Sequence, residues 1–145
     1  RQIADELIVI DTGSKDDTAA KAIAEGAQVR HWAWRDDFSL ARNESLKGAR
    51  GEWILILDAD ERLEAGAAQA LRQLDLSPSG PDAYQFQIIN FTSERLDEAD
   101  SNRLDQTRLF RNTSRFRYRC NVHNRLTDLR TGAPRSATAA RAAVV

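Results

Sequence analysis

The chain has 145 residues, of which 41% are hydrophobic and 30% are charged, and this composition is that of a globular protein with one core. No apolar run approaches the ~20 residues of a membrane span, and the single cysteine, Cys120, excludes a disulfide framework or a thiolate metal cluster. The net charge of -1 combines an acidic body with residues 103–130, which hold eight arginines and two aspartates. A general nucleic-acid binder is therefore not expected, and these arginines either bind an anion or cover exposed strands.

As far as residue 76, strand patterns alternate with helix patterns. Aliphatic or alternating runs predict strands, and Ala-rich or amphipathic runs that end near glycine predict helices. Asp36 or Asp37 is the expected N-cap of the second helix. The expected strands span residues 6–11, 28–34 and 52–58, and the expected helices span residues 16–27, 36–51 and 61–74. This order predicts right-handed βαβ units, an α/β fold and a parallel sheet.

The pattern changes at residues 77–82, which contain two prolines and a glycine. Beyond them, the sequence predicts strands without intervening helices and a polar loop over residues 92–102. The expected strands span residues 83–91, 107–112 and 116–126. Residues 131–145 are low in complexity and are expected to form a disordered tail.

Acidic side chains follow two of the predicted strands. Because ligands bind beyond the carboxyl ends of the strands in an open parallel sheet, Asp11 and Asp58 are expected to face one crevice. Asp58 and Asp60 form a D-x-D pair, and we expect them to have no local basic partner. Their oxygens suit Mn²⁺ or Mg²⁺, which would offset the charge of a leaving diphosphate. Two structural explanations stay open: a turn with a helix cap after Asp11, and a capping box formed by Asp58 and Glu61.

Four segments, in this order, carry a resemblance to a known family. They read ELIVIDTGSKDDT (6–18), WRDDFSLARNESLKGARGEWILILDADERL (34–63), RLFRN (108–112) and NVHNRL (121–126). Over residues 3–126 the chain resembles family 2 glycosyltransferases, in particular the bacterial lipopolysaccharide-core glucosyltransferase-like enzymes. The resemblance implies a GT-A, Rossmann-like fold, with a mostly parallel sheet, helices on both faces and a β-rich acceptor-side segment.

The same resemblance implies roles for five residues. Asp11 would hydrogen-bond the base or ribose of a nucleotide, and Arg42 would lie near the nucleotide and its diphosphate. Asp58 would contact the ribose or share the metal, Asp60 would be the principal metal ligand, and His123 would complete the metal site. Without the resemblance, Arg42 could equally be a surface ion-pair partner and His123 an ordinary strand residue.

The implied reaction moves a sugar from a nucleotide-diphosphate sugar, expected to be a UDP-sugar, to an acceptor hydroxyl with inversion, using Mn²⁺ or Mg²⁺. The expected acceptor is a saccharide, a lipid-linked group or a protein, in lipopolysaccharide or other cell-surface glycan synthesis. The expected location is the cytoplasm, including the inner face of the membrane by peripheral association. A carboxylate must accept the acceptor proton. Relatives usually carry Glu after the histidine of the VH motif, whereas this chain has Asn124, so Asp100 and Asp105 are the remaining candidates.

We expect one domain over residues 1–130, with a nucleotide-sugar half (1–76) and an acceptor-side half (83–130). It would lack the first strand and helix of its relatives, which would uncover Leu7 and Val9 and leave the chain marginally stable. Three alternatives remain. The chain could be a non-catalytic nucleotide-sugar-binding remnant, a haloacid-dehalogenase-type phosphatase with D-x-D, or a nucleotidyltransferase. Arg62, where that phosphatase motif needs Thr or Val, argues against the second, and the lack of a Gly-rich basic loop argues against the third.

Overall fold

The computed structural model describes residues 3–91 and 101–144 of the chain. They form two compact units, each assembled from separate stretches of sequence. The first unit contains Ile3–Glu52 and Asn112–Pro134, and the second contains Trp53–Arg111 and the residues from Arg135 onward. Each unit therefore includes residues from both of the halves expected from the sequence, because tertiary contacts join segments that are distant along the chain.

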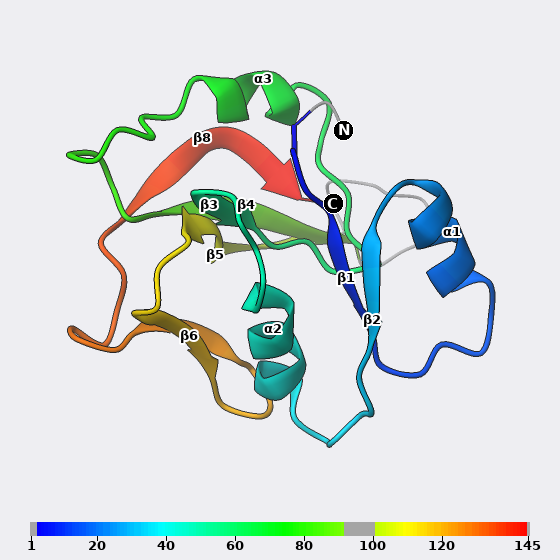
Figure 1. Cartoon of the computed structure of the whole chain (residues 1–145). Coiled ribbons are helices and arrows are strands. Elements are labelled where there is room, and N and C mark those ends of the chain that lie inside the picture. The colour runs from blue at the N-terminus through cyan, green and yellow to red at the C-terminus, as the bar shows by residue number, and fades with distance from the viewer. Residues whose placement is uncertain (1–2, 92–100, 145) are drawn as a thin grey trace. The chain divides into compact units, whose positions relative to one another are not determined.

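The first unit combines a parallel strand pair, two helices and a β-hairpin (Figure 1). Asp11 at the end of β1 lies beside His31 of β2, and α1 connects these two strands, which confirms a βαβ unit. Helix α2 packs against β1 and β6, and β6 pairs with β7 in antiparallel fashion. The elements of this unit are β1 (Ile8–Asp11), α1 (Thr18–Ala24), β2 (Gln28–His31), α2 (Phe38–Leu46), β6 (Phe116–Arg119) and β7 (Arg125–Asp128).

Side-chain hydrogen bonds fix both ends of α2. The Asp37 carboxylate accepts the backbone N–H groups of Ser39 and Leu40 at 2.8 and 3.2 Å, so Asp37 is the N-cap. At the other end, the Arg30 guanidinium donates to the backbone carbonyl of Lys47. A cation at this position satisfies a free carbonyl and interacts favourably with the helix dipole. The sequence therefore predicted the cap correctly, within its two alternatives.

The second unit contains a four-stranded sheet in the order β3-β5-β4-β8. β5 is antiparallel to both β3 and β4, whereas β8 is parallel to β4. Its elements are β3 (Trp53–Leu55), α3 (Ala67–Arg72), β4 (Ala83–Phe91), β5 (Ser101–Arg111) and β8 (Ser136–Val144). The α/β class predicted from the sequence is confirmed, although the strand pairing among the described residues is mixed rather than mostly parallel.

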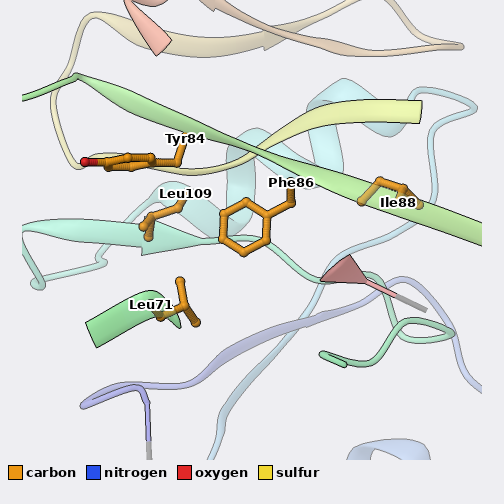
Figure 2. Packing of buried hydrophobic residues seen from close by; sticks show 5 residues of the cluster. All are labelled: Leu71, Tyr84, Phe86, Ile88 and Leu109. Carbon is orange, nitrogen blue, oxygen red and sulfur yellow. The ribbon is translucent and has the colours of Figure 1, made fainter. Parts of the chain in front are cut away.

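The core of the second unit lies between α3 and the sheet (Figure 2). Alternate residues of β4 are buried, and Phe86 is fully enclosed. The Tyr84 hydroxyl donates to the carbonyl of Asp75 at 2.8 Å, which satisfies the one polar group that this ring brings into the core. The clustered side chains, drawn in Figure 2, are Leu71, Tyr84, Phe86, Ile88 and Leu109.

The end of the chain differs from the expected disordered tail. Strand β8 occupies Ser136–Val144 and pairs with β4 on the side away from β5. Low complexity predicts little side-chain packing, but adding a strand to a sheet edge depends on backbone hydrogen bonds, which any non-proline residue can supply. None of the helices in the described part of the chain has the length and apolarity needed to cross a membrane.

Most predicted elements are shorter in the structure, and three predictions differ from it by more than such shortening. The third helix starts at Ala67 rather than residue 61, because Gly66 has a φ of 91° and residues before it form turns. The strand predicted over 116–126 is a hairpin, β6 and β7, with a turn at residues 120–124. β5 already begins at Ser101, inside the predicted loop, and the rest of that loop lies outside the described residues.

Candidate active site

Asp11 closes the loop that follows β1. Its Oδ1 accepts the backbone N–H groups of Gly13 and Ser14 at 3.1 and 2.8 Å, and its Oδ2 lies 3.1 Å from Nδ1 of His31. These hydrogen bonds, above all the one from the Ser14 N–H, lower the pKa of the Asp11 carboxyl to about 2. The carboxyl is therefore ionised at neutral pH, with one oxygen committed to the turn. A turn after Asp11 is the structural explanation that the sequence left open for this loop, and the nucleotide contact of Asp11 stays a prediction.

Arg42 lies on α2 where the helix meets β6. Its guanidinium carbon is 5.4 Å from the centroid of the Tyr118 ring, within the range of a cation–π contact. The neighbouring Asn43 fixes the same junction, because its amide donates to the carbonyl of Tyr118 and accepts from the N–H of Tyr118, each at 2.9 Å. Arg42 is thus held against a strand rather than extended from an isolated helix face. The sequence did not single out Asn43 or Tyr118.

His123 belongs to the turn between β6 and β7. Both His123 and Cys120 have left-handed backbone conformations, with φ values of 53° and 73°. Such values are uncommon for residues other than glycine and are found frequently at functional sites. The carbonyl of Asn121, within this turn, accepts the N–H of Phe38 at the start of α2 at 3.1 Å. His123 is exposed and lies in a turn, rather than in the strand that the sequence allowed as the structural explanation.

The two aspartates of the D-x-D pair have different surroundings in the second unit. Asp60 is exposed, in the turn that follows β3. Asp58 is partly buried, and its Oδ2 lies 3.3 Å from Nη1 of Arg108, while Nη2 of Arg108 contacts Oε1 of Glu61. We expected no local basic partner for these acids, and the partner of Asp58 is indeed distant, because β5 brings Arg108 to it from 50 residues further along the chain.

Glu61 takes part in the turn through its side chain. The N–H of Asp58 donates to Oε2 of Glu61 at 2.9 Å, and the N–H of Glu61 donates to the carbonyl of Asp58 at 3.0 Å. Half of the predicted capping box is thus present, but it closes a turn and not a helix. The spacing of Glu61 from Asp58 indicated this contact in the sequence. Arg108 was included in the sequence analysis only as part of the RLFRN segment, with no role assigned to it.

The carboxylates of the D-x-D pair are of the chemical type that Mg²⁺ and Mn²⁺ prefer. Among the described residues there is no group of three or more His, Cys, Asp or Glu side chains placed to hold a metal ion. Mg²⁺, however, commonly uses one or two carboxylates together with substrate phosphates and water. Asp60, with its exposed carboxylate, suits that arrangement, and Asp58 shares its carboxylate with Arg108. His123 lies in the first unit and the two aspartates lie in the second.

The candidates for the general base are less well defined. Asp105 is exposed on β5, where its pairing partner is Gln87 of β4. Asp100 lies outside the described residues. Asn124, where the family resemblance implies a glutamate, is partly buried at the end of the turn before β7. The assignment of the base therefore stays a prediction.

Comparison with known sequences places these features in context. Residues 2–131 match the family described as Glycosyl transferase family 2. A TPR repeat-containing protein of Synechococcus elongatus is 43% identical over 125 residues, which make up 86% of this chain and 29% of that protein. The SPbeta prophage-derived glycosyltransferase SunS of Bacillus subtilis is 40% identical over 57 residues, which make up 38% of this chain and 14% of that protein. The chain thus spans less than a third of the length of these curated relatives.

Proposed function

Because this chain belongs to glycosyl transferase family 2, we propose that it transfers a sugar from a nucleotide-diphosphate sugar, specifically a UDP-sugar, to an acceptor hydroxyl. The α/β class agrees with the Rossmann-like GT-A fold that family membership implies. In this proposal the anomeric configuration inverts, and the acceptor is a saccharide, a lipid-linked group or a protein. The product belongs to lipopolysaccharide or another cell-surface glycan, made in the cytoplasm, including the inner face of the membrane.

One observation carries the proposal: an exposed Asp60 lies in a turn after β3 that Arg108 and Glu61 hold in place. A fixed turn that carries the exposed carboxylate of Asp60 is suited to binding a metal–diphosphate group, because an exposed carboxylate remains accessible to a ligand. Mn²⁺ or Mg²⁺, when bound there, would neutralise charge on the leaving diphosphate. Asp60 is the principal ligand in this proposal, with contributions from Asp58 and His123.

Arg42 and Asp11 are the proposed nucleotide-binding residues. Arg42 keeps a positive charge near the diphosphate, and its contact with Tyr118 limits the conformations of its side chain. Asp11 contacts the base or ribose through its Oδ2, the carboxylate oxygen that lies beside His31 and takes no part in the backbone turn. Residues 1–76 bind mainly the donor and residues 83–130 mainly the acceptor. The acceptor hydroxyl attacks the anomeric carbon in line, and its proton passes to a carboxylate, for which Asp105 and Asp100 are candidates.

A second candidate function is nucleotide-sugar binding without transfer. Asn124 favours it, because an amide cannot accept the proton that the glutamate of relatives could accept. In that case the donor would bind in the same metal-dependent manner, but no sugar would reach an acceptor or water.

A binding and turnover experiment separates these functions. Thermal shift with UDP, GDP and their sugars, each with Mn²⁺ and with chelator, identifies the nucleotide. Product analysis of the bound sugar then distinguishes transfer, hydrolysis to free sugar, and intact donor. We expect metal-dependent stabilisation by UDP-sugars together with transfer or slow hydrolysis. Intact donor would indicate the non-catalytic function, release of inorganic phosphate from phosphate esters would indicate the phosphatase alternative, and equal UDP affinity in chelator and Mn²⁺ would contradict the metal site.

A further inference from the structure

Arg108, which contacts the D-x-D turn, is the most buried Lys or Arg side chain among the described residues. Only 3% of its surface is exposed, although it carries a permanent positive charge. A guanidinium is buried at acceptable cost only when carboxylates and other acceptors compensate its lost hydration. Asp58 and Glu61 supply that compensation, one at each terminal nitrogen of the guanidinium. Two carboxylates on one planar group fix its orientation as well as its charge.

The backbone at Arg108 is irregular in a way that directs this side chain. Tyr84 pairs with Leu109 and the next residue, Gln85, pairs with Thr107, so Arg108 is the extra residue of a β-bulge in β5. Bulges redirect side chains and are common beside active sites. The carbonyl of Arg108 accepts the N–H of Ile56 at 2.8 Å, just after β3. The bulge is thus bonded to the chain immediately before the D-x-D turn.

The turn itself is closed through the same groups. Glu61 binds the N–H of Asp58 with one carboxylate oxygen and Arg108 with the other. The four residues 58–61 are therefore held at both ends, and Asp60 lies between them with an exposed side chain. The direction of the Asp60 carboxylate depends on the backbone of this turn, and the turn depends on Arg108.

We propose that Arg108 is a positioning residue: through Asp58 and Glu61 it fixes the D-x-D turn so that Asp60 presents its carboxylate to a divalent cation and a nucleoside diphosphate. The inference rests on the proposed function, because it assigns a purpose to the turn that carries that function. It also changes the expected role of Asp58, whose carboxylate then acts on the turn through Arg108 as well as on the ligand. A purely structural Arg108 would affect folding alone.

The test compares UDP affinity with Mn²⁺ and with chelator by calorimetry, alongside urea unfolding of each variant. Arg108→Lys keeps the charge but loses the two-pronged geometry, and Arg103→Lys on the same strand is the matched control. Because a lone change could prevent folding, Arg108→Gln combined with Glu61→Gln removes both charges together. We expect the Mn²⁺-dependent gain in UDP affinity to fall about tenfold or more in the folded Arg108 variants. Their UDP affinity in chelator should stay unchanged, and the Arg103→Lys control should keep the wild-type gain.

The possible outcomes distinguish the positioning role of Arg108 from the proposed metal-dependent function. A folded Arg108 variant that keeps the wild-type gain with Mn²⁺ would overturn the positioning role and leave the proposed function intact. If wild-type protein shows no gain with Mn²⁺, the proposed metal-dependent function fails, and the positioning role fails with it. A double variant with wild-type unfolding and a lost gain would support positioning, since a structural role alone cannot produce that combination.

Discussion

Asn43 on α2 and Tyr118 on β6 are joined by two hydrogen bonds of 2.9 Å, in which a side-chain amide pairs with a backbone N–H and carbonyl. The amide thus occupies the place of a neighbouring strand. Asn43→Ala leaves both backbone groups without this partner, so we expect unfolding free energy to fall by about 1–3 kcal/mol. Urea unfolding measures it. Asn90→Ala, at an exposed position of β4, should change little and serves as the control; equal effects at both positions would contradict the importance of the pair.

Asp60 should matter for binding and not for folding. Its side chain is exposed, so Asp60→Asn should leave the unfolding midpoint unchanged while removing most of the Mn²⁺-dependent gain in UDP affinity. Calorimetric titration with UDP in Mn²⁺ and in chelator measures the difference. Glu64→Gln removes one negative charge from another exposed position nearby in the sequence and is the matched control. A full Mn²⁺ effect in Asp60→Asn would show that Asp60 does not bind the metal.

Asp11 should make the free energy of unfolding depend on pH in the acid range. Hydrogen bonds from Ser14 and Gly13 depress the pKa of its carboxyl in the folded state to about 2, from an ordinary value of 3.8. The ionised form is thus favoured by folding, and its contribution is present above pH 3.8 and is lost as pH falls towards about 2. Asp11→Asn should therefore be less stable than wild type at neutral pH. Urea midpoints of the two proteins should converge over this interval, and a constant difference would contradict the assignment.

His123 can be tested without disturbing its unusual backbone. Asparagine tolerates a left-handed conformation better than most residues, so His123→Asn should keep the turn while removing the imidazole. We expect weaker Mn²⁺-dependent UDP binding and an unchanged melting temperature. Cys120→Asn alters the other left-handed residue of this turn and should bind normally. Unchanged binding in His123→Asn would make the histidine a turn residue only.

The sequence determined the elements whose causes are local. The alternation of aliphatic runs and Ala-rich segments was enough for the α/β class, and the sequence limited the N-cap of α2 to Asp36 or Asp37. The spacing of Asp58 and Glu61 predicted the contact between the Asp58 N–H and the Glu61 carboxylate, because that contact joins residues only three apart. The D-x-D motif and its neighbours also led to the family, because motif order is a property of sequence alone.

Only the tertiary structure decided which distant residues meet. Arg108 reaches Asp58 and Glu61 because β5 pairs with β3 and carries a bulge at that residue, and neither the pairing nor the bulge has a local sequence signal. Strand β8 replaced the expected disordered tail because β4 offered an edge of backbone groups, which composition does not reveal. Asn43 meets Tyr118, 75 residues away, for the same reason. Contacts between distant segments depend on how strands and helices assemble, and local propensity does not determine that assembly.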